Sequence, residues 1–398
     1  MKRSTSSAKA VVIGAALVGS VPAFAQSSVT LYGIVDNGLA YQSSSTSLGS
    51  TSGGHSVVKM TPGVWAGSRF GLKGGEDLGG GTKAIFRLES GFNSLTGAQS
   101  SPGTIFNRQA YAGLSNDRYG TLTLGRQYTP YFSMVGALGP TGVLTGATGA
   151  HPGDVDALDT TLRFNNSVTY ASPVIAGLAF SAQYGLGGVP GSIASGSNFS
   201  AALRYDYKPV SVAAGYVKLK DIATSPALGT FAINSPVNNG YASAQSAQLV
   251  AAAARYTYND LMLGLNYSNV QYAPGSRSLF ADEAVFNSYG AIATYRFTSA
   301  VNVAAGYSYT RASKANGITD PAQYHQISFE ETYSLSARTT FYALQAYQKA
   351  RGQSLIAAGG AGGTVIANAV AVVGDSQNGT PSSGQSQFVA MVGIRHAF

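Results

Sequence analysis

The 398-residue sequence contains no cysteine, few charged residues and no long apolar run. Without cysteine the chain can form no disulfide framework, no thiol nucleophile and no cysteine-based zinc site. Charged residues make up 11% of the chain, whereas a typical soluble domain has about 25%. An apolar content of 44% with 11% aromatic residues excludes a disordered chain. A mean hydropathy of +0.06 is too low for a bundle of membrane helices. These limits favour an all-β protein with an unusual surface.

Residues 1–25 have the pattern of a cleaved export signal. Three basic residues (Lys2, Arg3 and Lys9) are followed by an apolar run over 10–19 and a small-x-small triplet at 23–25. That run is too short for a membrane anchor, which needs about 20 residues. We therefore expect the mature chain to begin at Gln26 and to form one domain over 26–398. Its formal charge is +5, because 22 Lys and Arg remain against 17 Asp and Glu. Export and the lack of a Lys/Arg cluster argue against a nucleic-acid partner.

The rest of the chain reads as sixteen strands whose connections alternate between short and long. One predicted strand spans 55–75, and the next spans 81–92. The seven short connections lie at 74–80, 115–118, 172–176, 208–209, 259–260, 298–299 and 334–337. The long ones between them are polar and rich in Gly, Ser and Pro. Strict alternation is typical of an up-and-down β-barrel that crosses a membrane, with turns on one side and loops on the other. Such a barrel also explains the low charge, since half of each strand faces lipid.

Aromatic residues recur in pairs where strands enter the short turns. The pairs are Tyr205 with Tyr207, Tyr256 with Tyr258, and Tyr295 with Phe297. Tyrosine is frequent in all β-strands, but its repeated placement beside the turns favours an aromatic girdle at a membrane interface. The final strand, 385–398, is also amphipathic and stops on the aromatic Phe398, whereas the ends of soluble domains usually fray.

Several motifs along the whole chain resemble Gram-negative general porins, particularly those of β-proteobacteria. They are SVTLYGIVD at 28–36, SRFGLKG at 68–74, EDLG at 76–79, KAIF at 83–86, RQAYAGL at 108–114, LGRQ at 124–127 and VGIRHAF at 392–398. The resemblance implies a 16-stranded antiparallel barrel in the outer membrane, assembled as a homotrimer, through which ions and small hydrophilic solutes diffuse passively. It also implies that Phe398 is the signal recognised by the outer-membrane assembly machinery, and that the third external loop folds inward and narrows the channel.

That third loop corresponds to residues 128–162, the longest connection without convincing strand character. A long loop in a compact fold usually carries function. Its acidic residues are Asp154, Asp156 and Asp159. We expect Asp154 and Asp156 in particular to form the negative wall of a constriction, because channels select ions with charged side chains on opposing walls. The alternative is a solvated turn on an external loop.

The positive wall follows from strand alternation. In the second strand Phe70 and Leu72 suit lipid, so Arg69 and Lys73 point into the lumen. In the third strand the same argument turns Arg87 inward.

In the fourth strand Tyr111 suits lipid, which turns Arg108, Ala110 and Ala112 inward. The family resemblance places Arg69 and Arg108 in the constriction, whereas Lys73 and Arg87 rest on alternation alone. Arg126 shares its face with Leu122 and Leu124. Either a bulge at Gly125 reverses its direction, or it lies at the rim, and it is not assigned to the site.

Other functions are less consistent with this pattern. An outer-membrane enzyme needs a nucleophile, a base and an orienting group, yet none of the four histidines, at 55, 151, 325 and 396, lies in a recognisable nucleophile setting. A surface β-rich adhesin would lack the outward apolar band. A substrate-specific channel stays open as an alternative. The sequence predicts no cofactor and no metal, and its +5 mature charge indicates a modest preference for anions.

Overall fold

The computed structural model describes residues 28–47, 50–159, 162–358, 362–375 and 381–398. The predicted signal peptide and its cleavage site lie outside these residues. The strands are β1 (Ser28–Ser45), β2 (His55–Pro62), β3 (Arg69–Gly79), β4 (Thr82–Gly91), β5 (Gln109–Asn116), β6 (Gly120–Tyr128), β7 (Arg163–Ala171), β8 (Leu178–Gly185), β9 (Asn198–Tyr207), β10 (Val210–Lys220), β11 (Leu228–Thr230), β12 (Ser246–Tyr258), β13 (Leu261–Ala273), β14 (Ala284–Arg296), β15 (Val301–Ala312), β16 (Gln323–Ser334), β17 (Thr339–Arg351), β18 (Gln353–Ala357), β19 (Thr364–Asn368) and β20 (Ser386–Ala397). The short helical segments are η1 (Tyr131–Val135), η2 (Gly136–Leu138), α1 (Pro140–Val143), η3 (Gly146–Gly149), η4 (Pro152–Asp154) and η5 (Asn239–Tyr241). Among the described residues, no helix has both the length and the apolar character needed to span a bilayer.

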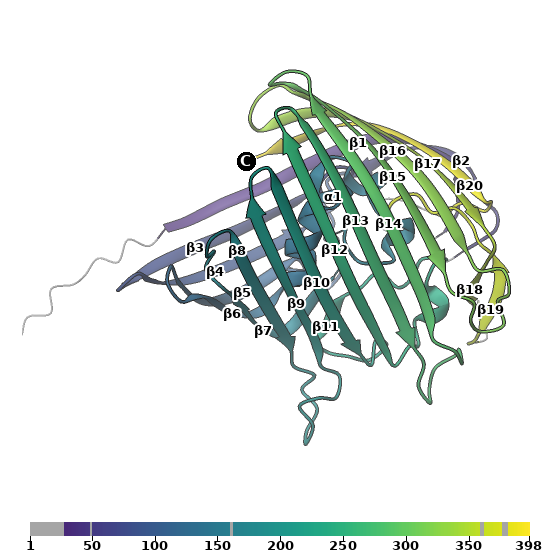
Figure 1. Cartoon of the computed structure of the whole chain (residues 1–398), viewed down its shortest axis with the longest axis horizontal. Coiled ribbons are helices and arrows are strands. Elements are labelled where there is room, and N and C mark those ends of the chain that lie inside the picture. Colours follow the sequence, from purple (N-terminus) through teal and green to yellow (C-terminus); the bar gives the residue numbers. More distant parts are fainter. Residues whose placement is uncertain (1–27, 48–49, 160–161, 359–361, 376–380) are drawn as a thin grey trace, which may run out of the picture.

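The strands form a closed antiparallel barrel of 16 wall strands, as the sequence predicts (Figure 1). β2 and β3 count as one wall strand because both pair with β1, one after the other. The three-residue β11 comes from a long connection and pairs with the start of β7. The last strand, β20, closes the barrel because it pairs with both β17 and β1. At this seam the backbones of Phe398 and Gly33 exchange two hydrogen bonds of 3.0 Å.

The predicted continuous strand 55–75 is interrupted at residues 63–68, which is a correction to the sequence analysis. The interruption has a specific cause in β1. The carboxylate of Asp36 accepts hydrogen bonds from the backbone N–H groups of Trp65 and Ala66, at 3.0 and 2.6 Å. These amides therefore bond to a buried side chain instead of to a neighbouring strand.

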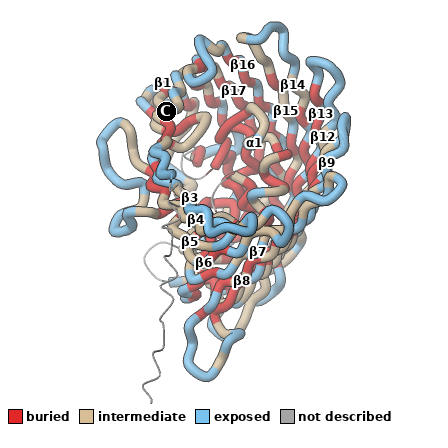
Figure 2. Tube along the Cα trace, turned by 90° about the vertical axis from the view of Figure 1, so that its left-hand side faces the viewer, coloured by how far each residue is buried: buried red, intermediate tan, exposed pale blue. Residues whose placement is uncertain are grey.

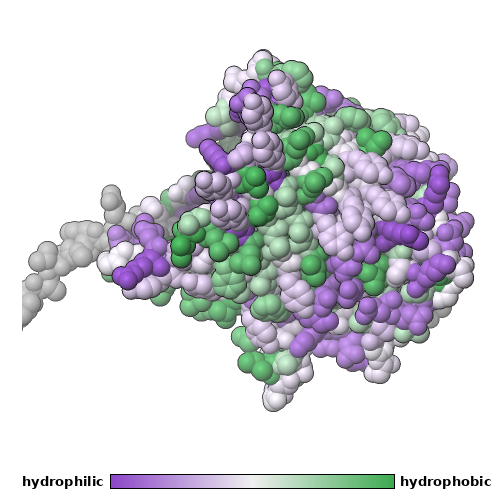
Figure 3. Space-filling model, viewed as in Figure 1, coloured by the Kyte–Doolittle hydropathy of each residue, from purple (hydrophilic) through white to green (hydrophobic). Residues whose placement is uncertain are grey.

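The barrel presents its large apolar side chains outward. Leu31, Leu124 and Leu265 are 57–66% exposed on the outer face, and hydrophobic residues gather over the strands in the space-filling view (Figure 3). The paired aromatics beside the short turns also point outward. Tyr207, Tyr258 and Phe297 are 62–68% exposed. In contact with lipid this outer face would be buried, which accounts for the scarcity of charge.

The interior of the barrel is occupied in part by the connection between β6 and β7. We call its described residues, 129–159 and 162, the inner loop. Its helical segments pack against the inner faces of β9, β10 and β12, and its η3 segment packs against β17. Buried apolar residues of the inner loop, including Tyr131, Val135, Leu138, Val155 and Leu162, join wall residues in one core cluster. The buried segments lie inside the ring of strands (Figure 2). The expectation that this connection folds into the barrel is therefore confirmed.

Candidate functional site

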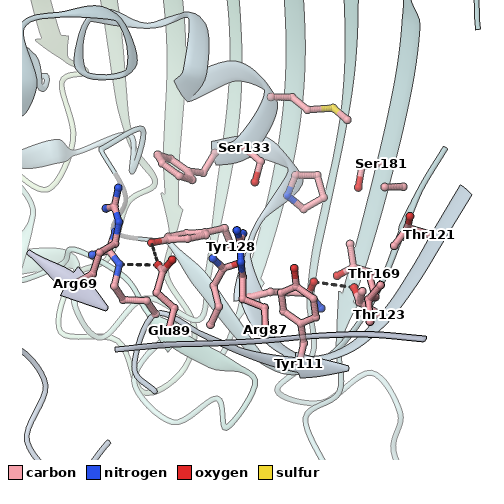
Figure 4. Close-up of a pocket in the computed structure, with 18 of the residues that line it drawn as sticks. Arg69, Arg87, Glu89, Tyr111, Thr121, Thr123, Tyr128, Ser133, Thr169 and Ser181 are labelled. Atoms are coloured by element: carbon pink, nitrogen blue, oxygen red, sulfur yellow. Dashed lines mark hydrogen bonds and ion pairs between the residues drawn. The ribbon is translucent and has the colours of Figure 1, made fainter. Parts of the chain in front are cut away.

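A cluster of arginine and tyrosine side chains lines the barrel wall that the inner loop leaves uncovered (Figure 4). Arg108 Nε donates a hydrogen bond to Glu89 Oε1 at 2.9 Å, and the Tyr32 hydroxyl donates to Glu89 Oε2 at 2.8 Å. The guanidinium groups of Arg108 and Arg163 lie over the ring of Tyr128, 5.8 and 4.7 Å from its centroid. Cation–π contacts with one shared ring therefore hold two like charges close together, and Glu89 neutralises one of them.

Three further basic residues continue this wall. We call the whole set, Arg69, Lys73, Arg87, Arg108 and Arg163, the arginine wall. Arg87 lies opposite Lys73 in the β3–β4 register, and both stack over the ring of Tyr32, at 5.3 and 5.5 Å from its centroid. Arg69 lines the same cavity as Arg87 and Arg108. Within the part of the chain that the structure describes, none of Arg69, Lys73 and Arg87 forms an ion pair. Their positive charge is thus available to a passing solute.

Arg108 lies where two interior cavities meet. One cavity, of about 620 Å³, runs from the arginine wall toward the short-turn ends of β6, β7 and β8, where it is lined by Thr121, Thr169 and Ser181. The other, of about 520 Å³, is lined by residues of the long connections, such as Asn93 and Gln99. Arg108 lines both cavities and is 8% exposed. The two cavities therefore reach this side chain from opposite ends of the barrel.

The orientation predicted for the β5 strand is wrong, although Arg108 still reaches the interior. Tyr111 lines the larger cavity and is the register partner of Arg87, so it faces the lumen rather than lipid. Ala110 and Ala112 consequently face outward. Arg108 precedes the first residue of β5 and follows no strand alternation. Its backbone N–H donates to the carbonyl of Glu89, which fixes the start of its side chain beside the carboxylate that it binds.

Asp154 and Asp156 do not face this wall, contrary to the expectation from sequence. Both are 0% exposed, so neither side chain contacts the open cavity. Asp156 Oδ2 lies 2.6 Å from Nδ1 of His151 and accepts a hydrogen bond of 2.5 Å from the hydroxyl of Ser268 on β13. His151 Nε2 in turn lies 3.1 Å from Nδ2 of Asn266, also on β13. These groups attach the inner loop to the opposite side of the barrel.

The environment of Asp156 favours its ionised form. Burial alone raises the pKa of this carboxyl, but the charge and hydrogen bond of His151 and the hydroxyl of Ser268 bring the pKa below its usual value. Asp154 serves the loop itself, because its Oδ1 accepts the backbone N–H of Asp159 at 3.0 Å.

Asp159 is the acidic residue of the inner loop whose carboxyl is near Arg108. Its pKa is raised well above the ordinary value by burial and by the like charge and hydrogen bond of Asp375. Asp375 belongs to the connection between β19 and β20. From the sequence, Asp159 is the least favoured of the three acidic candidates in the loop, and Asp375 is not a candidate.

Arg126 does not line the 620 Å³ cavity beside the arginine wall. The β6–β7 register shifts between Gly125 and Gln127, which is the bulge that one alternative required. The bulge does not turn Arg126 into the cavity, however. Its guanidinium donates to the carbonyl of Asn107 at 2.7 Å, and also to the side chains of Asn165 and Thr230. It therefore connects three segments near the long connections.

Two arginines of the interior were not assigned to the site from the sequence. Arg163 is the first residue of β7 and follows the inner loop, so no alternation pattern precedes it. Arg395 stacks over Trp65 at 5.0 Å from the ring. Its sequence signal was available, because it alternates with the outward Ile394 of the last strand.

Comparison with known proteins decides the family. The family model described as "Gram-negative porin" matches residues 10–353. The chain is a Gram-negative porin. Porins are outer-membrane channels for passive diffusion and not enzymes, so the enzyme and adhesin alternatives are removed. The family also places this chain in the outer membrane, as the sequence analysis predicted.

Relatives of this porin come from several Gram-negative bacteria. An outer membrane porin protein of Bordetella pertussis is 30% identical over 86% of this chain and 94% of its own length. Outer membrane porin protein 32 of Delftia acidovorans is 29% identical over 98% of this chain and 99% of its own. Among solved structures, an anion-selective porin from Comamonas acidovorans has the same fold, with a TM-score of 0.67 at 24% identity over 94% of this porin and 100% of that chain. The trimer form of OmpT from Vibrio cholerae has a TM-score of 0.61 at 14% identity, over 94% and 99% of the two chains.

Proposed function

We propose that this porin is a channel with a preference for anions whose constriction lies at Arg108. The supporting observation is that the two interior cavities both end on this side chain. Arg69, Arg87, Arg108 and Arg163 form the basic side of the constriction, with Lys73 farther along the same wall. Glu89 neutralises one of these charges.

A surplus of positive charge in a narrow aqueous path raises the local concentration of anions. Low-dielectric walls focus the field of such charges, and salt screens it over about 10 Å at 0.1 M ionic strength. We therefore expect anion preference to be strongest in dilute salt. The cluster binds small hydrophilic anions through charge alone and requires no cofactor, which is the behaviour of a diffusion channel rather than of a pore with one dedicated solute.

The proposed assembly is a homotrimer in the outer-membrane bilayer. The trimer form of a solved porin with the same fold supports this assembly, and closed symmetric oligomers are the usual arrangement of identical chains. The position of Phe398 at the seam between the first and last strands supports its proposed role as the residue that the assembly machinery recognises.

The test is the reversal potential of the purified porin in a planar bilayer with a salt gradient. We expect Arg69→Glu to shift this potential toward cation preference, because the substitution reverses one unpaired charge of the wall. Arg118→Glu is the matched control, since Arg118 is exposed in the short turn between β5 and β6. An unchanged potential in Arg69→Glu, or an equal shift in Arg118→Glu, would contradict the proposal.

A further inference from the structure

A second connection also enters the barrel. Residues 369–375, which we call the inserted segment, follow the β18–β19 hairpin and precede β20. Ala369, Val370, Ala371, Val372 and Val373 are 0–5% exposed. Four of them belong to the same core cluster as the inner loop, whereas Val373 packs among inward residues such as Leu344, Val389 and Met391. The inserted segment therefore lies on the inner face of the wall.

A row of three glutamines holds this segment in place. Gln326 on β16, Gln348 on β17 and Gln387 on β20 lie directly opposite one another in the strand register. Gln348 binds both backbone groups of Val372, because its Oε1 accepts the N–H at 2.7 Å and its Nε2 donates to the carbonyl at 2.8 Å. Gln387 Oε1 accepts the N–H of Val373 at 2.9 Å. An inward amide that satisfies both backbone groups of one residue acts in place of a neighbouring strand.

The same row attaches the inner loop. Gln326 Nε2 donates to the carbonyls of Thr148 and Ala150, at 2.8 and 3.0 Å. Gln348 Nε2 also donates to Gln326 Oε1 at 2.7 Å, so the contacts to the two connections are joined.

The inserted segment and the inner loop also touch each other directly. A Cβ atom at Gly374 would lie 2.8 Å from the carbonyl of Ala147, so their backbones approach closely. Asp375 is hydrogen-bonded to Asp159. The two connections therefore fill the β16–β20 side of the lumen together.

The open cavities lie on the other side. The 620 Å³ cavity is lined by residues of β1, β3–β8 and the start of the inner loop. The 520 Å³ cavity is lined by the long connections that precede β3 and β5, and by Arg108 and Arg163. Of the residues that the structure describes in β16, β17, β20 and the inserted segment, none lines either cavity. Permeating solutes are thus confined to the arginine side of the barrel.

We propose that the inserted segment, held by the glutamine row, sets the upper size of the solutes that pass this porin. The arginine wall determines the charge preference, and the segment that fills the opposite side of the lumen limits solute size. This inference rests on the channel function proposed above. Gln348 is the positioning residue, because it provides both hydrogen bonds to Val372 and the link to Gln326.

The test compares Gln348→Ala with wild type in planar bilayers and in liposomes. Release of the segment widens the path, so we expect single-channel conductance to rise by roughly 1.5- to 2-fold, because conductance follows the width of the pore. Larger neutral sugars should enter liposomes, while the reversal potential in a salt gradient stays unchanged. Gln345→Ala is the matched control. Gln345 is on the same strand, but it faces outward, where it donates to Glu331.

A second variant covers the case in which Gln348→Ala fails to fold. Replacing residues 369–375 by an equal number of glycines removes the apolar packing and leaves the three glutamines and the wall intact. It should raise conductance and the sugar size limit in the same way. The chain contains no cysteine, so Val372→Cys reports the state of the segment independently. The thiol should resist a charged thiol reagent when Gln348 is present and react when Gln348 is replaced by Ala.

Unchanged conductance and an unchanged sugar limit in folded variants, with the thiol at position 372 reactive, would overturn the inference. That result would mean that the segment stabilises the barrel without limiting passage. The failure of the proposed channel function is distinguishable, because wild type itself would then show no conductance steps.

Discussion

Arg108 and Glu89 form an ion pair of 2.9 Å in which both side chains are at most 10% exposed. Arg108 of this pair lines both cavities, the first together with Arg69, Arg87 and Glu89 and the second together with Arg163. A buried pair of this kind fixes geometry more than it adds stability, since desolvation offsets much of the Coulomb attraction. Its consequence for the channel is that Glu89 reduces the positive charge of the constriction by one.

Glu89→Gln should therefore increase anion preference. The amide keeps the shape of the side chain but removes the negative charge beside Arg108. The reversal potential in a salt gradient should move further toward the anion value. The free energy of unfolding should fall by about 1–3 kcal/mol, because a charge-assisted hydrogen bond is weakened. A shift toward cations in the folded variant would show that Glu89 does not face the water path.

Asp156→Asn should loosen the attachment of the inner loop to β13. The substitution weakens the contacts of Asp156 with His151 and Ser268, each worth about 1–3 kcal/mol when a buried partner is left unpaired. Trp65 is the single tryptophan of the sequence and lies against Gly146 of the inner loop. Its fluorescence emission should shift to longer wavelength in the variant, and current noise should rise.

The sign of the pH effect at Asp156 follows from its lowered pKa. A carboxyl with a lowered pKa contributes stability above its unfolded value of about 3.9, and this contribution is lost as pH falls through the folded value. Acid titration of wild type should therefore reproduce the Trp65 shift of Asp156→Asn. Wild-type emission that stays constant through the acid range, while the variant differs, would contradict this account.

Asp375→Asn should weaken the pH dependence of the contact between the inner loop and the inserted segment. The raised pKa of Asp159 means that the folded state holds its proton more tightly than the unfolded state. The contact is thus most stable at low pH and weakens as pH rises through the folded pKa. Wild-type conductance should increase with pH over this range, and conductance of the variant should increase less, because burial of Asp159 persists without the charge of Asp375. Identical pH profiles would remove Asp159 and Asp375 from this role.

Phe398→Ala separates barrel stability from recognition by the assembly machinery. The Phe398 ring covers Gly33, where an added Cβ would lie within 3 Å of ring atoms. Loss of this cross-strand contact should cost about 1 kcal/mol or less. We expect the purified variant to fold normally in detergent, as measured by heat-dependent gel mobility. Its amount in the outer membranes of cells should be reduced. Equal amounts of variant and wild type in those membranes would contradict the proposed signal.

Strand number, turn positions and the outward face could be predicted because lipid imposes a simple rule on them. Each outward position must be apolar, so alternation around Phe70 and Leu72 turned Arg69 and Lys73 inward. The rule failed at Tyr111, because an aromatic ring packs against arginine side chains in the lumen as favourably as against lipid.

The positions of the two inserted connections could not be predicted from alternation. The hydrogen bond from Ser268 to Asp156 joins residues more than a hundred positions apart in the chain, and no local pattern specifies such a pairing. The apolar composition of residues 369–373 gave no indication of which surface covers them. The glutamine row is visible only once the register aligns Gln326, Gln348 and Gln387.

The most direct measurement of the central claim is the single-channel current of the wild-type porin in a planar bilayer with a salt gradient. The account predicts step-like openings whose reversal potential has the sign of anion preference and whose magnitude falls as total salt is raised. A reversal potential of the opposite sign would contradict an arginine-lined path, and the absence of conductance steps would contradict the channel itself.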